Sequence, residues 1–259
     1  MLNVESRIRN QELRIKYVLH LADNNLILGQ RLGEWCGHGP VLEQDIALTN
    51  IALDLIGQSR LLYQYAAELT GNSHEDALAF LRPEHEYRNV LLVEQPNGTF
   101  ADTVMRQYFY DAFTYLNWDA LQKCNDERLR AIAGKAIKEV AYHRRWSSEW
   151  VVRLGDGTSE SHDKAQGAVN RLWEYTGELF EPSDFETELK GTLNIPDVQA
   201  FYKTWLNHIR QTLDAATLEM PSVETWMQHG GKHGRHSEHL GFILAEMQYM
   251  QRTYPEMQW

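Results

Sequence analysis

The stretch from Ala133 to Val152 constrains the fold of this chain more than any other segment. It contains no proline, has one glycine near its start, and consists largely of residues with good helix propensity. Counted in helical steps from Glu139, one face carries aromatic side chains and an imidazole: Tyr142, His143, Trp146 and Trp150. We therefore expect a long helix that buries an acid beside a histidine, an arrangement that needs a specific partner for the charge.

Helical periodicity continues through most of the chain, and short turns join the long segments in pairs. Turns rich in glycine or polar residues occur at 36–40 and 124–126, and the irregular segment 82–100 connects the two pairs. Residues 178–194 are acidic and are interpreted as a loop. We predict four core helices and three additional ones: 11–35, 42–69, 101–123, 126–153, 161–177, 196–218 and 237–252.

Strand-like alternation never extends beyond a few residues. The two pairs of helices, joined by one long connection, are typical of the single-crossover bundle of ferritin-like proteins. The sequence therefore predicts an all-α fold: a ferritin-like four-helix bundle with additional C-terminal helices, forming a single domain over residues 1–259.

The charge balance of the chain disfavours two classes of partner. Its 36 Asp and Glu residues outnumber 25 Lys and Arg residues, which gives a net charge of −11. Such a chain repels nucleic acid and anionic membranes. Cys36 and Cys124 are too few for a disulfide framework, and the charged N-terminal segment does not have the pattern of a signal peptide. We expect a cytoplasmic protein that binds neither nucleic acid nor membrane.

One acidic residue lies on the expected inner face of each long helix. The two acids of each helical pair are separated by a similar number of residues. This layout is typical of di-metal carboxylate bundles, in which the second helix of each pair also supplies a Glu-x-x-His motif. The four acids are Asp23, Asp54, Asp111 and Glu139.

The histidines that such a metal site needs are not at the expected offsets. Three residues after Asp54 comes Gly57, and three residues after Glu139 comes Tyr142. His143 lies one step further, rotated by about 100° around the helix axis from the ligand position. A Glu and a His four residues apart can still chelate one metal ion, so this offset alone does not exclude a ligand.

Two interpretations of the acids therefore remain open. The first is a metal site formed by Asp23, Asp54, Asp111, Glu139 and His143, with Gln58 as a weak substitute ligand. The second, which we favour, is a degenerate site whose acids are neutralised by other side chains, with Lys138 or His143 among them. In that case the chain has no catalytic, cofactor-binding or metal-binding residues of its own.

The C-terminal segment is rich in histidine and locally basic. A zinc site is one alternative, but the segment contains neither cysteine nor a well-placed fourth ligand. Helix capping and surface packing are another. The third alternative is a flexible segment that contacts a partner or a phosphate-bearing ligand such as coenzyme A, through Lys232, His233, Arg235 and His236.

Several long stretches are similar to one protein family. They are LADNNLILGQRLGEWCGHGP, NIALDLIGQSRLLYQYAAEL, LLVEQPNGTFADTVMRQYFYDAF, KAIKEVAYHRRW and GGKHGRHSEHLGFILAEMQYMQR. Together they resemble the C subunits of bacterial phenylacetyl-CoA epoxidases, which are multicomponent oxygenases. The resemblance extends over nearly the whole chain, from about Leu13 to Trp259.

This resemblance implies a structural, non-catalytic subunit. It implies a heterodimer or larger assembly with a related A subunit that carries a di-iron centre, together with a reductase and a B subunit. The reductase would supply electrons from NADPH through FAD and a [2Fe-2S] cluster, and the isolated chain would form a homodimer. The implied reaction is the epoxidation of the ring of phenylacetyl-CoA with O2 in aerobic phenylacetate breakdown. A free-standing ferritin-like protein is the remaining alternative.

Overall fold

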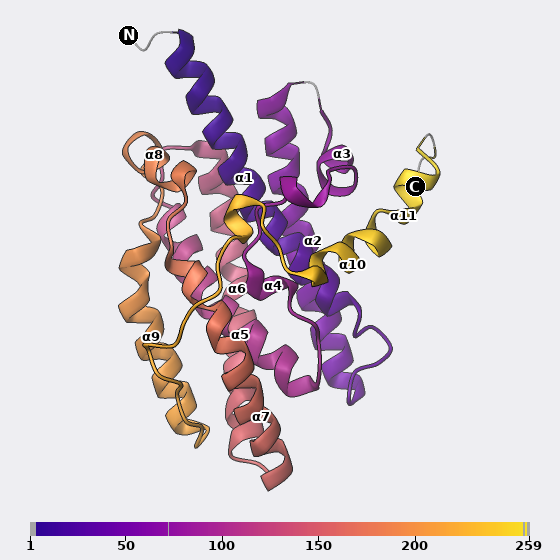
Figure 1. Ribbon diagram of the computed structural model, residues 1–259, viewed down its shortest axis with the longest axis vertical. Coiled ribbons are helices and arrows are strands. Elements are labelled where there is room, and N and C mark those ends of the chain that lie inside the picture. Colours follow the sequence, from indigo (N-terminus) through magenta and orange to yellow (C-terminus); the bar gives the residue numbers. More distant parts are fainter. Residues whose placement is uncertain (1–3, 72, 256, 258–259) are drawn as a thin grey trace. The chain divides into compact units, whose positions relative to one another are not determined.

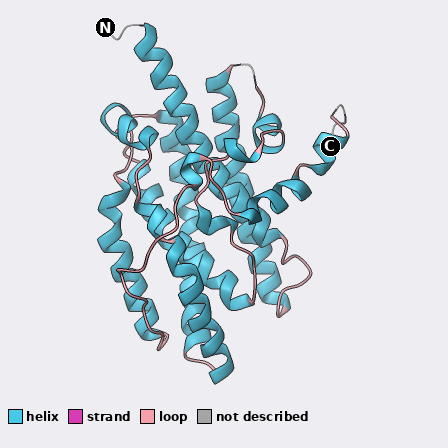
Figure 2. Ribbon diagram, viewed as in Figure 1, coloured by secondary structure: helices cyan, strands magenta, loops and turns pink. Residues whose placement is uncertain are grey.

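The predicted all-α class is confirmed. A computed structural model describes residues 4–71, 73–255 and 257, and these residues form helices and turns but no strand (Figure 2). No helix in this described part is long and apolar enough to cross a membrane. The chain divides into two compact units. The first unit takes the described residues of 1–94, 183–192 and 230–259, and the second takes 95–182 and 193–229.

The first unit is built on a pair of long helices joined by a loop over residues 34–41 (Figure 1). The second helix of the pair ends at Gly71, whose φ of +76° is a left-handed conformation that glycine adopts without strain. Shorter helices from the middle and the end of the chain complete the unit. The helices are α1 (Val4–Gly33), α2 (Leu42–Thr70), α3 (Glu75–Phe80), η1 (Glu84–Glu86), α4 (Leu91–Glu94), α8 (Asp184–Leu193), η4 (Gly231–His233), α10 (Glu238–Met247) and α11 (Tyr249–Thr253).

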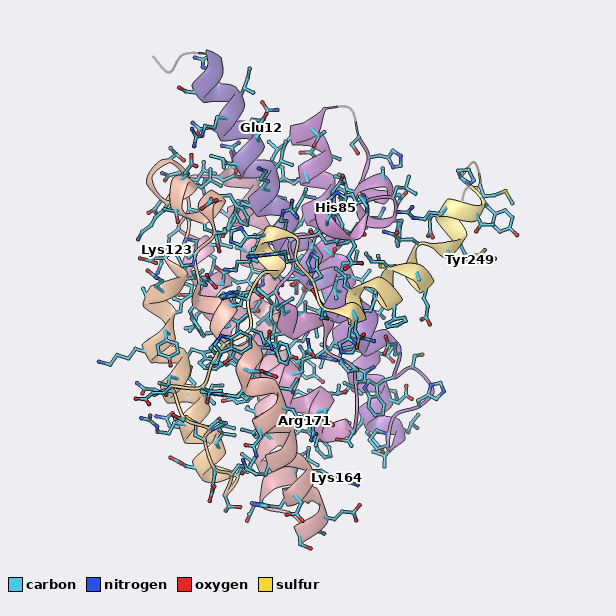
Figure 3. All side chains as sticks on the ribbon, viewed as in Figure 1. Glu12, His85, Lys123, Lys164, Arg171 and Tyr249 are labelled. Carbon is cyan, nitrogen blue, oxygen red and sulfur yellow. The ribbon has the colours of Figure 1, made fainter. Side chains whose placement is uncertain are left out.

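The second unit repeats the plan with a second long pair. Its first long helix begins with a capping box, in which Thr99 and Asp102 each bond to the backbone of the other. The helices are α5 (Phe100–Leu121), α6 (Glu127–Gly155), α7 (Ser159–Leu172), η2 (Trp173–Tyr175), η3 (Gly177–Phe180) and α9 (Val198–Ala215). Lys164 and Arg171 on α7 are exposed at the surface (Figure 3).

Aromatic residues dominate the core of the second unit. The Trp173 and Trp205 rings lie 5.9 Å from the ring of Phe109, centroid to centroid, and the indole N–H of Trp205 donates to the Phe109 carbonyl at 3.0 Å. The buried indole therefore keeps a hydrogen-bond partner, as a buried polar group requires. This core fixes α9 against α5.

Several expected boundaries differ from the observed ones: the helix expected over 161–177 ends at Leu172, and the one expected over 237–252 is divided into α10 and α11. The first long helix begins at Val4, seven residues before the predicted start, and α8 lies inside the segment interpreted as a loop. Single-domain organisation over residues 1–259 stays a prediction.

The buried face of α6 is rotated from the predicted one. It passes through Ala136, Val140, His143 and Ser147, which follow helical spacing. Tyr142 is 40% exposed and Glu139 keeps 22% of its side-chain surface, so the prediction that both lie on the inner face was wrong. Small and apolar residues define this side of the helix, and His143 and Trp146 of the predicted stripe are buried together with them.

Candidate functional site

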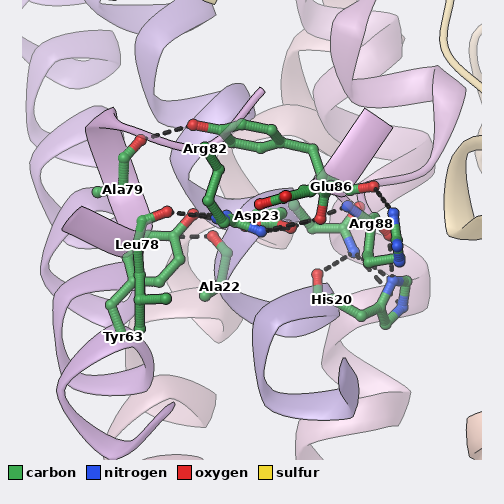
Figure 4. Close-up of polar contacts among 12 residues, drawn as sticks. His20, Ala22, Asp23, Tyr63, Leu78, Ala79, Arg82, Glu86 and Arg88 are labelled. Carbon is green, nitrogen blue, oxygen red and sulfur yellow. Dashed lines mark hydrogen bonds and ion pairs between the residues drawn. The ribbon is translucent and has the colours of Figure 1, made fainter. Parts of the chain in front are cut away.

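Asp23 lies on α1 and is fully buried in the first unit. The Tyr63 hydroxyl, from α2, donates to its Oδ1 at 2.6 Å, and the Arg88 backbone N–H donates to its Oδ2 at 2.8 Å. Arg82 completes the set: one terminal nitrogen donates to Oδ1 and the other to Oδ2, the latter at 3.2 Å (Figure 4). Both carboxylate oxygens therefore have charged or polar donors from the protein itself.

Arg82 comes from the segment that follows α3, and it is buried as well. Its guanidinium carbon lies 4.2 Å from the centre of the Tyr87 ring, and the Glu86 carbonyl accepts a hydrogen bond from Nη1 at 3.0 Å. Burial opposes the positive charge, but the Asp23 carboxylate outweighs it and holds the pKa of Arg82 above its usual value. Arg82 therefore stays positively charged at every physiological pH.

The residues around Asp23 do not fit a metal ion. The guanidinium of Arg82 already provides the positive charge that a metal ion would bring to this carboxylate. Asp54, the second expected acid of this unit, is only half buried, and Gly57 offers no ligand atom. Within the described ranges, no group of three or more His, Cys, Asp or Glu residues is placed to hold a metal.

A second buried carboxylate in the first unit, Glu94, holds the C-terminal segment. Its Oε1 accepts from Asn89 Nδ2 at 2.8 Å and lies 2.6 Å from His236 Nδ1. Its Oε2 accepts from the backbone N–H of Ser237 at 2.9 Å and from the Ser237 hydroxyl at 2.6 Å. Burial lowers the pKa of His236, but the hydrogen bond and charge of Glu94 outweigh burial and raise it.

Lys232 is also buried, and it forms an ion pair with Glu186 of α8 at 3.1 Å. Burial acts against the charge of Glu186, yet Lys232 lowers the pKa of Glu186 below its usual value. Gly231 precedes Lys232 where a Cβ atom would lie only 2.2 Å from the Asn89 carbonyl oxygen. Only glycine allows this backbone approach.

The four basic residues singled out in this segment therefore separate into two classes. Lys232 and His236 are committed to buried carboxylates, whereas His233 and Arg235 are exposed. Of the four, His233 and Arg235 are the ones with side chains at the surface.

The second unit contains one buried acid on its long helices that matches a predicted position, Asp111 of α5. Its Oδ1 accepts from Gln107 Nε2 at 2.7 Å, and its Oδ2 accepts from the Ser147 hydroxyl at 2.8 Å. Burial raises the pKa of Asp111 to about 7, against the opposing effects of nearby His143, Ser147 and Gln107. This carboxyl group is satisfied mainly by neutral donors, which do not balance a full charge.

Glu139 does not join Asp111 in a buried cluster. It is half buried and forms an ion pair with Lys135, one turn earlier, at 3.9 Å. Lys138, expected to fill the acidic centre, is exposed, while His143 is buried close enough to influence Asp111. The residues of this unit also do not fit a metal ion.

The sequence patterns did not identify the residues that matter most in these clusters. Arg82, Glu94 and Glu186 lie in segments without helical periodicity or in a short helix. One signal was available for Glu94: it directly follows the apolar run LLV. A charge at the end of such a run is often buried and paired.

Comparison with known proteins adds independent information. Residues 4–259 match the family described as phenylacetic acid catabolic protein. The chain is 49% identical to the C subunit of 1,2-phenylacetyl-CoA epoxidase from Escherichia coli (strain K12) over 243 residues, which is 94% of this chain and 98% of the relative. It is 26% identical to the A subunit of the same organism's enzyme over 153 residues, which is 59% of this chain and 48% of that relative.

Proposed function

The chain belongs to the phenylacetic acid catabolic protein family, and we propose on that basis that it is the structural, non-catalytic C-type subunit of a phenylacetyl-CoA epoxidase. In this role it pairs with a related A-type subunit in the cytoplasm and supports that partner's fold and active site. The similarity to the Escherichia coli C subunit over 98% of its length supports this assignment, because no large part of the relative is missing here.

The partners and cofactors follow from the same proposal. The A-type subunit carries the di-iron centre, a B subunit joins the assembly, and a reductase with FAD and a [2Fe-2S] cluster delivers electrons from NADPH. One atom of O2 is added across a double bond of the aromatic ring of phenylacetyl-CoA. The other atom leaves as water with the two electrons from NADPH and two protons, so the reaction balances.

The observation that carries the non-catalytic role is the buried ion pair between Arg82 and Asp23. A ligand carboxylate must be free to bind a metal ion, and this one is held by a guanidinium, a phenol and a backbone N–H. For iron to bind at Asp23, the guanidinium would have to leave and its positive charge would remain buried without a partner, which is strongly unfavourable.

Co-expression with an A-type subunit of such an epoxidase, followed by size and iron measurements, tests the proposal. We expect a stable complex whose iron is all in the A-type subunit, and an isolated chain without stoichiometric iron. Two irons bound per isolated chain would contradict the non-catalytic role. Failure of this chain to co-purify with the A-type subunit would favour the free-standing alternative instead.

A further inference from the structure

A small pocket of about 170 Å³ lies in the second unit, where α5, α6 and α9 meet. Each helix supplies residues that share a face at a spacing of three or four positions. The side chains used here are Tyr108 from α5, Arg144 and Ser148 from α6, and His208, Gln211 and Thr212 from α9. Arg144 acts electrostatically on the carboxyl group of Asp111, but no carboxylate lines the pocket.

Arg144 is the charged group of this pocket. Its guanidinium carbon lies 3.9 Å from the centre of the Tyr115 ring, so the ring supports one face of the guanidinium. No ion pair is found for Arg144 within the described residues, whereas Arg82, Arg153 and Arg171 each have a carboxylate partner. A stacked guanidinium keeps the N–H groups along its edge available for a planar or tetrahedral oxyanion.

His208 adds a second hydrogen-bonding group. Its Nδ1 is buried and has no hydrogen-bond partner in the described part of the chain. Burial and the neighbouring charge of Arg144 both lower the pKa of His208, and no carboxylate acts in the opposite direction. A bound anion would complete an environment in which an unpartnered buried nitrogen and a guanidinium line the same pocket and no carboxylate does.

The hydroxyl groups of the pocket bond to other groups of the protein. The Tyr108 hydroxyl lies 2.6 Å from Thr212 Oγ1 and 3.1 Å from the backbone carbonyl oxygen of His208, which can only accept. Burial raises the pKa of Tyr108 to about 12, which keeps its phenol protonated. The amide of Gln211 supplies two further N–H donors.

We propose that this pocket binds a phosphate group. The guanidinium of Arg144 would take two phosphate oxygens side by side, with His208 and Gln211 donating to the others. The pocket is open to solvent, so the phosphate can be free inorganic phosphate or one phosphate group of a larger molecule such as coenzyme A. This inference does not rest on the proposed function, because the groups that form the site belong to this chain alone.

Calorimetric titration of the full-length chain with inorganic phosphate, coenzyme A and dephospho-coenzyme A tests the proposal. We expect saturable binding of at least one of the three. The Arg144→Gln variant should bind at least tenfold more weakly, because the charged fork is lost. Arg145→Gln is the matched control: this neighbour does not line the pocket, lies near the Tyr142 ring instead, and should change affinity less than twofold.

The three probes distinguish the source of the phosphate. Equal affinity for phosphate and coenzyme A indicates free phosphate, while loss of binding with dephospho-coenzyme A alone indicates the ribose phosphate. Equal binding of both coenzymes, but not of phosphate, indicates the diphosphate.

Because Arg144→Gln can also loosen the Tyr115 contact, Gln211→Glu provides a second variant that places a negative charge in the pocket and should also abolish binding. No saturable binding of any probe, or equal affinity of the Arg144 and Arg145 variants, would overturn the proposal.

Discussion

The guanidinium of Arg82 and the carboxylate of Asp23 form a buried ion pair although 59 positions separate the two residues in the chain. Asp23 is on a long regular helix, and Arg82 is in an irregular segment. The Tyr63 phenol contacts both: it donates to Asp23 Oδ1 at 2.6 Å and accepts from Arg82 at 3.2 Å. This cluster links α1, α2 and the segment after α3 in one electrostatic unit.

Replacing Arg82 should therefore be costly. Arg82→Gln leaves the Asp23 carboxylate buried without its counter-charge, and we expect a loss of about 3–5 kcal/mol in the free energy of unfolding. Urea denaturation of the isolated chain measures this change. Arg60→Gln is the control, because its ion pair with Glu75 is largely exposed and should contribute about 1 kcal/mol or less.

A double variant separates the ion pair from simple packing. Asp23→Asn combined with Arg82→Gln removes both charges and should recover a large part of the stability lost in Arg82→Gln alone. If the losses in the free energy of unfolding of Asp23→Asn and Arg82→Gln simply add in the double variant, the two charges are not coupled.

The carboxyl group of Asp111 makes the stability of the second unit depend on pH. Its pKa of about 7 is raised above the value of about 3.9 for an unfolded chain, so the folded state holds the extra proton between these values. This group's contribution to the free energy of unfolding falls as pH rises from about 4 to about 7, and then levels off. Burial is the cause, since the neutral acid is easier to bury than the carboxylate.

Asp111→Asn removes this titration while keeping the shape of the side chain. The variant should gain stability relative to the wild-type protein at pH 8 and show a smaller difference at pH 5. Unfolding curves at both pH values measure the difference between the two proteins, which removes the contribution of groups they share. The same difference at pH 5 and pH 8 would mean that Asp111 ionises normally.

The contact between His236 and Glu94 makes stability depend on pH in a higher pH range. The pKa of His236 is raised above the value of about 6.5 for an unfolded chain. Its stabilising contribution is fully present below pH 6.5 and is lost as pH rises through the folded-state pKa. Because Glu94 also holds Ser237, we expect this loss to appear first as local opening of the segment around Gly230 and α10.

Hydrogen exchange resolved by residue measures this opening. His236→Gln should increase exchange in residues 230–247 at pH 6, where the imidazole of the wild-type protein is protonated, and have a smaller effect at pH 9. His233→Gln is the control, because His233 is exposed. Equal protection of the segment in both variants would show that Glu94 holds it without the imidazole.

The regular helices could largely be predicted from the sequence. The segment predicted as 42–69 is Leu42–Thr70, and the segment predicted as 101–123 is Phe100–Leu121, because long periodic patterns and caps define them locally. The short α8 could not be predicted in the same way. Its Glu186 is held by Lys232, which lies 46 positions away, and short helices depend on such tertiary contacts.

The candidate site was predicted less completely than the fold. Periodicity correctly placed Asp23 and Asp111 inside, since both are surrounded by apolar residues at helical spacing. It also placed Glu139 and Tyr142 on the buried face of α6, where they do not lie. A row of aromatic residues and a row of small residues are adjacent on this helix, and periodicity alone did not show which row faces the core. The neutralising cation was not predictable, since the segment that carries Arg82 has no periodic pattern and pairs with a distant residue.

The observed buried face of α6 differs from the predicted one, and this changes the expected effect of tryptophan substitutions. Trp146 is buried and its ring lies 6.4 Å from the ring of Phe100, whereas Trp150 is half buried. Trp146→Ala should lower the free energy of unfolding by about 3–5 kcal/mol, and Trp150→Ala by less. Glu149→Ala, which removes an exposed partner of Arg153, should cost less than about 1 kcal/mol. Similar losses for all three variants in urea denaturation would contradict the observed orientation of α6.

The double change Asp54→Asn with Glu139→Gln tests the non-catalytic role directly. Both acids are half buried, and Asn and Gln keep the shape and hydrogen-bonding capacity of the side chains that they replace, so the double change should disturb the fold little. In a complex reconstituted with the A-type subunit, we expect turnover within a few-fold of the wild-type value. If the two carboxylates bound iron, neutral amides would replace them poorly and turnover would be lost. The measurement is epoxidation per assembled complex, with the iron content of the A-type subunit determined in the same sample. Loss of turnover in a complex that still assembles and keeps that iron would show that this chain takes part in the chemistry.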